Sequence, residues 1–149
     1  MQALPLSPAL TPLRLVPGDD LRVALQHALR DAGMQAAFVV QGMGSLSVAQ
    51  LRYAGAQDAT ALHGDLEILT LAGSLSPDGP HLHMSVANAR GEVFGGHVAP
   101  GCIVRTTAEI LVALLPEHRF SREIDPRTGF AELVVRNSGR AHTVGKNGD

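Results

Sequence analysis

The stretch from residue 81 to residue 97, HLHMSVANARGEVFGGH, constrains the fold of this chain more than any other. In Asn88-Ala89-Arg90-Gly91 an Asx residue opens a type I turn and a glycine closes it. This is the pattern of a three-residue hairpin loop whose last residue is left-handed. The chain therefore reverses here with Asn88 opposite Glu92, and the same register places His83 opposite His97.

Three histidines then share one face of this hairpin. Side chains two apart on a strand point to the same side, so His81 accompanies His83, and His97 faces them from the second strand. The other face is apolar, which is what a strand pair lying on a hydrophobic core needs. The residues of that second face are Leu82, Met84, Val86, Phe94 and Val98.

Imidazoles grouped in this way suit a metal ion. Three neutral imidazoles can hold Zn²⁺ or a similar divalent ion and leave a fourth position for water or a ligand. Gly95 and Gly96 leave room beside His97. Two other interpretations stay open: His-x-His pairs also occur on exposed strands without a metal, and a slip of one residue would send His97 to the core face. We expect a metal or anionic-ligand site at His81, His83 and His97.

Size and composition predict a single domain with an aliphatic core. The chain has 149 residues, 45% of them hydrophobic and 17% charged, with no tryptophan and one tyrosine. That length supports one good core. Sparse charge beside much aliphatic content indicates that other subunits cover part of the surface.

Charge argues against direct DNA binding. The formal net charge is -2, and the single lysine is Lys146. A free-standing DNA-binding domain usually carries a basic patch, and the sequence contains no cluster of lysine and arginine.

One cysteine, Cys102, excludes an intramolecular disulfide. It is either a small buried hydrophobic residue or a soft metal ligand near the histidines. No apolar run approaches the roughly 18 residues of a membrane-spanning helix, and the proline-rich beginning does not fit a secretory signal. We therefore expect a cytoplasmic protein that does not interact with membranes.

The first third of the chain contains a clear helix. Residues 1–12 form an extended, proline-rich lead-in, and a strand over 13–16 follows. Pro17-Gly18-Asp19 supplies a turn and an N-cap, after which apolar residues recur at helical spacing over 21–32. Gly33 ends this helix.

The remainder is expected to be mostly strands. A tight turn over 42–45 separates the first two, and a turn over 125–129 precedes the last. The segment 103–115 suits a helix in part, but the β-branched residues at its start favour a strand. Residues 137–149 are predicted to form a flexible tail, which leaves 13–136 as the folded domain. The expected strands are 36–41, 46–53, 66–75, 103–115 and 130–135.

Two carboxylates lie within predicted strands. Glu67, among apolar neighbours, is expected at a sheet edge or paired with Arg52, Arg105 or a neighbouring subunit. Glu109 is either a salt-bridged or edge carboxylate, or a metal ligand or general base.

Several spaced elements carry a family resemblance. They are Arg14 with Pro17-Gly18-Asp19-Asp20-Leu21, Gly44-Ser45-Leu46 with Leu51-Arg52, Glu67-Ile68 with Leu71 and Gly73-Ser74, Gly79-Pro80-His81-Leu82-His83, Gly91, Gly95-Gly96-His97 and Thr107-Ala108-Glu109. By their order and spacing, the chain from Arg14 to Val135 resembles the plants-and-prokaryotes-conserved (PPC) domain family, and within it the stand-alone prokaryotic branch.

The resemblance implies an α/β fold of the α+β type, in which one or two helices pack on a mostly antiparallel mixed sheet, and a homotrimer. It also implies that His81, His83 and His97 are metal ligands. In plants the domain resembles a self-association and partner-binding module that follows AT-hooks, and bacterial members are often called DNA-binding by that association. This chain has no Arg-Gly-Arg-Pro hook, and Asp65 replaces an arginine of the plant pattern.

Two functions are therefore expected. The first is a homotrimeric module that binds a metal or ligand and acts on transcription through partner proteins, with little direct DNA binding. The alternative is a zinc-dependent hydrolase or lyase that acts on a small polar substrate at the three histidines. For that enzyme the pattern offers Glu109, and behind it Glu67, as the general base.

Overall fold

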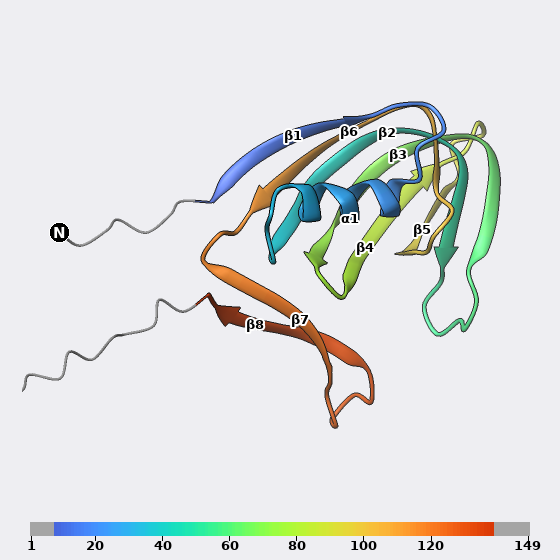
Figure 1. The fold of residues 1–149 in the computed structure, drawn as a ribbon. Coiled ribbons are helices and arrows are strands. Elements are labelled where there is room, and N and C mark those ends of the chain that lie inside the picture. The colour runs from blue at the N-terminus through green and yellow to red at the C-terminus, as the bar shows by residue number, and fades with distance from the viewer. Residues whose placement is uncertain (1–7, 139–149) are drawn as a thin grey trace, which may run out of the picture.

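Long strands joined by short connections make up most of the chain, and the computed structural model describes residues 8–138 (Figure 1). The elements in order are β1 (Ala9–Leu15), α1 (Leu21–Asp31), β2 (Ala37–Arg52), β3 (Thr60–Ser76), β4 (Gly79–Ala87), β5 (Val93–Val98), β6 (Ile103–Leu114), β7 (His118–Ile124) and β8 (Ala131–Asn137).

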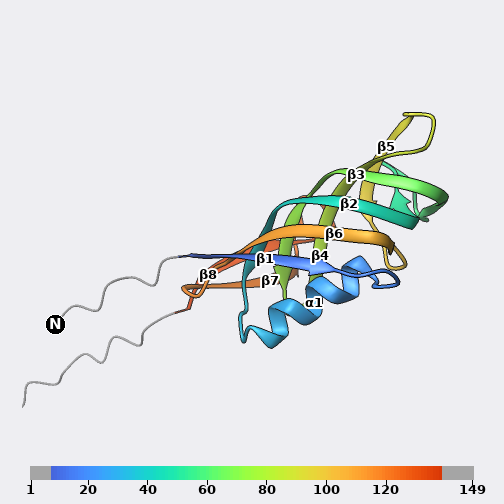
Figure 2. The same ribbon diagram turned by 90° about the horizontal axis from the view of Figure 1, so that it is seen from above.

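Six strands form one curved sheet in the order β1-β6-β2-β3-β4-β5. The end of β2 pairs also with β5, so the sheet curls back on itself. α1 packs against β3, β4 and β6 on one side of this sheet (Figure 2). β7 and β8 form a separate two-stranded sheet, and the pairings of the named strands are all antiparallel. The predicted α+β fold, a mostly antiparallel sheet packed by a helix, is confirmed.

The core between α1 and the sheet is aliphatic, as the composition predicted. Fully burying one such side chain stabilises the fold by about 1.5–3 kcal/mol. The largest fully buried side chains are Leu21, Leu25, Leu46, Leu51, Leu71, Leu75, Leu82, Val39, Val86, Val98, Val104 and Cys102.

α1 forms where the spacing of leucines predicted it. Its buried face consists of Leu21, Leu25 and Leu29. The N-cap is Asp20, whose carboxylate accepts two backbone N–H groups of the first turn, whereas Asp19 accepts the N–H of Val16. The cap thus lies one residue later than predicted.

The tight turn predicted over 42–45 is wrong, because β2 runs straight through it. The two strands predicted on either side of it belong to this one strand. A Cβ at Gly44 would overlap the backbone oxygen of Thr107 on β6, and a Cβ at Gly42 would lie 2.9 Å from Leu71 Cδ2. These glycines allow neighbouring strands to approach closely.

The two ends of the domain differ in detail from the sequence prediction. β1 begins at Ala9, inside the predicted lead-in, and it accommodates Pro12 because it is an edge strand. The strand predicted over 103–115 is confirmed as β6, and the last predicted strand corresponds to β8, where it pairs with β7. Asn137 still belongs to β8, and the tail from residue 139 lies outside the described residues.

Over residues 8–138, no helix has the length and apolar character needed to cross a membrane.

Candidate metal centre

Asn88 organises the turn between β4 and β5. Its side-chain oxygen accepts the backbone N–H groups of Arg90 and Glu92 at 2.9 and 3.0 Å. Gly91, whose φ is 78°, donates its N–H to the Asn88 carbonyl at 2.9 Å. The predicted loop is therefore present, and His83 lies opposite His97 as its register required.

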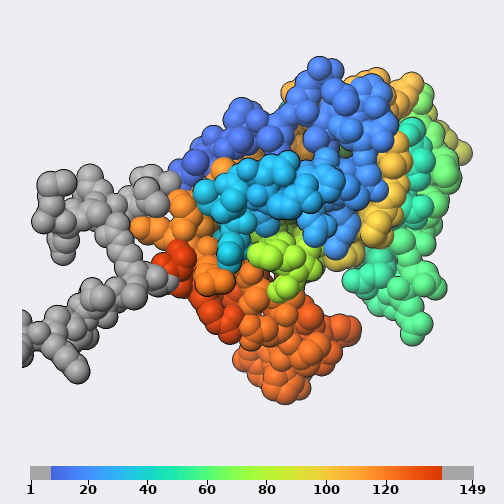
Figure 3. Space-filling view, in the orientation of Figure 1, coloured from blue at the N-terminus to red at the C-terminus, as the bar shows by residue number. Residues whose placement is uncertain are grey.

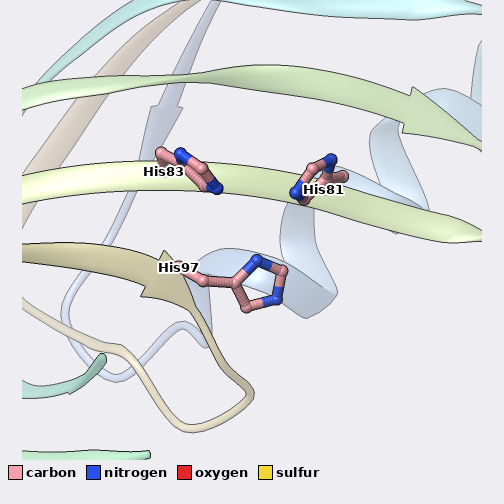
Figure 4. Close-up of side chains that lie close together, drawn as sticks. All are labelled: His81, His83 and His97. Carbon is pink, nitrogen blue, oxygen red and sulfur yellow. The ribbon is translucent and has the colours of Figure 1, made fainter. Parts of the chain in front are cut away.

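The hairpin brings the three predicted histidines together. His81 and His83 extend from β4 and His97 from the end of β5, and the rings lie close to one another (Figure 4). Their ring centroids are separated by 5.1 Å for His81 and His83, 5.2 Å for His81 and His97, and 5.8 Å for His83 and His97. One ligand nitrogen from each ring lies within 4.8 Å of the other two. Their role as metal ligands stays a prediction.

The opposite face of β4 enters the core. Leu82, Met84 and Val86 are at most 3% exposed. The imidazoles therefore contribute little to core packing. The second strand of the hairpin lies tightly against β2, where a Cβ at Gly96 would come within 2.7 Å of the Arg52 carbonyl oxygen.

The surroundings favour neutral imidazoles. Burial, followed by the nearby charges of Arg52 and His81, lowers the pKa of His97 to about 4. Burial also lowers the pKa of His81, with Arg122 as the next cause. Neutral imidazole is the form that binds metal, so the two half-buried histidines are ready to act as ligands at neutral pH.

The donor set fits a zinc-like ion. His97 Nδ1 is buried and forms no hydrogen bond within the part of the chain that the structure describes. Leaving such an atom unpaired costs about 1–3 kcal/mol. With Zn–N bonds of about 2.0–2.1 Å, the ligand nitrogens of a tetrahedral site lie roughly 3.4 Å apart. Ring rotations would bring the three histidine nitrogens from their present separations of up to 4.8 Å to this distance. The three histidines would hold the ion and leave a fourth position open.

The other predicted site residues lie elsewhere. Glu109 is on β6, opposite Arg14 of β1 and Met43 of β2, and β2 and β3 separate it from β4, which carries His81 and His83. Cys102 is buried in the core, where burial raises the pKa of its thiol and its sulfur accepts the Gln50 backbone N–H at 3.2 Å. Neither residue joins the histidine group.

Glu67 is not at a sheet edge, because β3 lies between β2 and β4. Its side chain is exposed, and the described residues offer it no salt bridge. Arg105 pairs with Asp65 instead, at 3.0 Å. Pairing with a neighbouring subunit stays a prediction.

Sequence reasoning missed a pocket of about 560 Å³ that shares His81 and His97 with the cluster. Its charged lining comes from α1, β2, β7 and β8 and from the turn between β3 and β4, segments that no local pattern connects. These charged residues are Arg22, Arg52, Asp78, Arg122 and Glu132.

Known sequences are similar to this chain over most of its length. Residues 8–116 match the Plants and Prokaryotes Conserved (PCC) domain, under which the resembled PPC family is described. The bifunctional protein GlmU of Synechococcus sp. (strain JA-2-3B'a(2-13)) is 53% identical over 125 residues, which are 84% of this chain and 20% of that protein. The chain spans about a fifth of the length of the curated relatives it matches.

Solved structures share the fold over nearly the whole chain. A hypothetical protein from Salmonella cholerae-suis is 36% identical with a TM-score of 0.86, covering 89% of this chain and 96% of that one. A metal-containing protein from Archaeoglobus fulgidus is 26% identical with a TM-score of 0.72, covering 86% and 94%. A protein from Ralstonia eutropha JMP134, provisionally named as DNA-binding, is 25% identical with a TM-score of 0.68, covering 84% and 89%.

Proposed function

This chain belongs to the Plants and Prokaryotes Conserved (PCC) domain family, and from that membership and its histidine cluster we propose that it is a homotrimeric metal- and ligand-binding module that acts on transcription through partner proteins. The metal is zinc or a similar divalent ion, held by His81, His83 and His97. When bound, such an ion supplies an open coordination position for a ligand.

The observation that carries the proposal is the convergence of three imidazoles, one of which, His97, has a buried Nδ1 with no hydrogen-bond partner among residues 8–138. A metal ion satisfies that nitrogen and uses all three side chains at once. The Archaeoglobus fulgidus protein, 26% identical to this chain, is named as metal-containing, which supports the same assignment.

Two further observations favour a module over a hydrolase or lyase. Glu109 and Glu67, which the sequence offered as general bases, lie away from the histidine group. The curated relatives are about five times as long as the matched segment, as expected for a domain that works beside other protein parts.

Exposed apolar side chains on the sheet support self-association. Four large ones on β1, β2 and β3 are between 45% and 64% exposed, and a surface of this kind is normally covered by another subunit. We expect the trimer to bury them. They are Leu10, Val40, Met43 and Leu69.

Light scattering on a size-exclusion peak, with elemental analysis of the same fractions, tests assembly and metal together. For protein reloaded with zinc after chelation, we expect a mass about three times the chain mass of 15.6 kDa and about one zinc per chain. A monomer mass at micromolar concentration contradicts the trimer. A zinc-free peak contradicts the metal module.

Direct binding to duplex DNA is expected to be weak or absent at physiological salt. Contacts to phosphate supply most non-specific affinity, and five arginines already pair with carboxylates on the protein surface. Fluorescence anisotropy of a labelled duplex across a salt series checks this. A steeply salt-dependent, submicromolar affinity contradicts it and would indicate that trimerisation gathers arginines on one surface. The paired arginines are Arg30, Arg90, Arg105, Arg127 and Arg136.

A further inference from the structure

Three arginines from distant parts of the sequence line the pocket that shares His81 and His97 with the metal centre. Arg22 comes from α1, Arg52 from the end of β2 and Arg122 from β7. Figure 3 shows the surface on this side hollowed between the orange β7–β8 hairpin and the green connection from β2 to β3. The pocket brings three guanidinium groups close to the histidines.

Arg52 is fixed beside His97 by strand pairing. The two residues lie directly opposite each other where β2 meets β5. Directly opposed side chains in an antiparallel pair have Cβ atoms about 4.5–5.5 Å apart. The Arg52 guanidinium donates to the Ala56 carbonyl at 3.3 Å, which leaves most of its donors available.

Arg22 reaches the pocket from the first turn of α1. Its guanidinium donates to the Val98 carbonyl at 3.3 Å, and a Cβ at Gly79 would lie 3.7 Å from its Nη2. Burial lowers the pKa of Arg22, whereas Asp20 raises it. The oxygens of Asp20 already accept backbone N–H groups of Arg22, Val23 and Gly101. A partly desolvated guanidinium of this kind gains more than an exposed one from an added anion.

Arg122 is held on the opposite wall by the separate β7–β8 sheet. Its Nη2 donates to Ser74 Oγ at 2.6 Å, and its backbone N–H donates to Asp78 at 2.8 Å. These contacts hold Arg122 against β3 and the turn that follows it.

The pocket carries more positive than negative charge. Its acidic residues are Asp78 and Glu132, against three arginines, and a bound divalent ion would add to the excess. Glu132 already accepts a hydrogen bond from Thr128 Oγ1 at 3.0 Å. Within residues 8–138, Arg22, Arg52 and Arg122 form no salt bridge, although five other arginines do.

We propose that this pocket binds the oxyanion group, a carboxylate or a phosphate, of a small molecule through Arg22, Arg52 and Arg122, next to the metal position. The planar fork of a guanidinium group can donate two parallel hydrogen bonds to a pair of oxygens of a carboxylate or of a phosphate. A second polar atom of the same molecule can then reach the open position at the metal. This inference extends the proposed function by naming the class of ligand, and the anion part does not require the metal to be present.

Calorimetric titration of the metal-free full chain with inorganic phosphate and, separately, with succinate tests the pocket. Binding in the millimolar range or tighter is expected for at least one of them, and the stronger binder identifies the source of the oxyanion. Arg52→Gln and Arg122→Gln should each weaken binding by roughly tenfold or more, because each removes a charge-assisted hydrogen bond. Arg105→Gln, which removes a surface arginine outside the pocket, should leave binding unchanged.

Zinc content of the same variants separates this inference from the proposed function. Arg52→Gln should keep its zinc, because removing a neighbouring positive charge does not disfavour a cation. Absence of binding to both anions by the wild-type chain, or an equal loss in Arg105→Gln, overturns the anion pocket whatever the zinc content. Loss of zinc from the wild type with intact anion binding overturns only the metal proposal. Thermal melts of the exposed Arg52→Gln variant confirm that it is folded.

Discussion

Replacing any one of His81, His83 or His97 with alanine is expected to remove most of the zinc from the chain while leaving it folded. Two imidazoles bind the ion more weakly than three. Removing a residue that only hydrogen-bonds to a ligand typically lowers metal affinity by roughly 10–100-fold, and removing a ligand itself should lower it by more. The fold survives because the core residues of β4 point to the other face. Elemental analysis after chelation, reloading and dialysis measures the effect, and circular dichroism checks the fold.

His27→Ala is the matched control, because His27 is exposed on α1 and outside the cluster. It should retain as much zinc as the wild type. Equal zinc uptake by the wild type and by the three cluster variants would mean that the histidines are ordinary surface residues.

Gly73→Ala is expected to lower the free energy of unfolding by about 3 kcal/mol or more and to displace His81. Gly73 has a φ of 153°, and a Cβ there would overlap the His81 backbone oxygen across the β3–β4 pairing. The substitution therefore combines backbone strain of about 1–3 kcal/mol with overpacking of similar size. Urea denaturation measures the change, and zinc content should fall in parallel because β4 carries two of the three ligands.

Gly64→Ala is the matched control, because it introduces backbone strain without steric overlap. Gly64 lies on the same strand with a φ of 126°, but a Cβ there meets no atom within 4 Å. Only the strain cost is expected, with zinc binding retained. Equal destabilisation of both variants would show that the contact with His81 does not matter.

The histidine cluster was accessible to sequence reasoning because its geometry is local. Asn88 and Gly91 specify the turn, the turn specifies the register, and the register places His97 opposite His83. The buried face of α1 followed from leucine spacing for the same reason. Structural features that depend only on residues close together in the chain can be predicted from a single sequence.

Features set by distant strands could not be read in this way. Gly42 and Gly44 resemble a turn in sequence, but their role is to let Leu71 and β6 approach β2 closely. Those contacts arise from pairing between strands that are far apart in the chain. Arg122 and Glu132 reach the site only because the β7–β8 hairpin folds back, and no periodic pattern reports that contact. Glu109 was a candidate general base by residue type alone, and the strand order separates it from the histidines.

Anomalous X-ray scattering from crystals of zinc-loaded protein, recorded on both sides of the zinc absorption edge, tests the central claim most directly. We expect one strong zinc peak per chain, within about 2.0–2.1 Å of one nitrogen from each of His81, His83 and His97. No peak among these three rings, or zinc bound only at other surface residues, would contradict it.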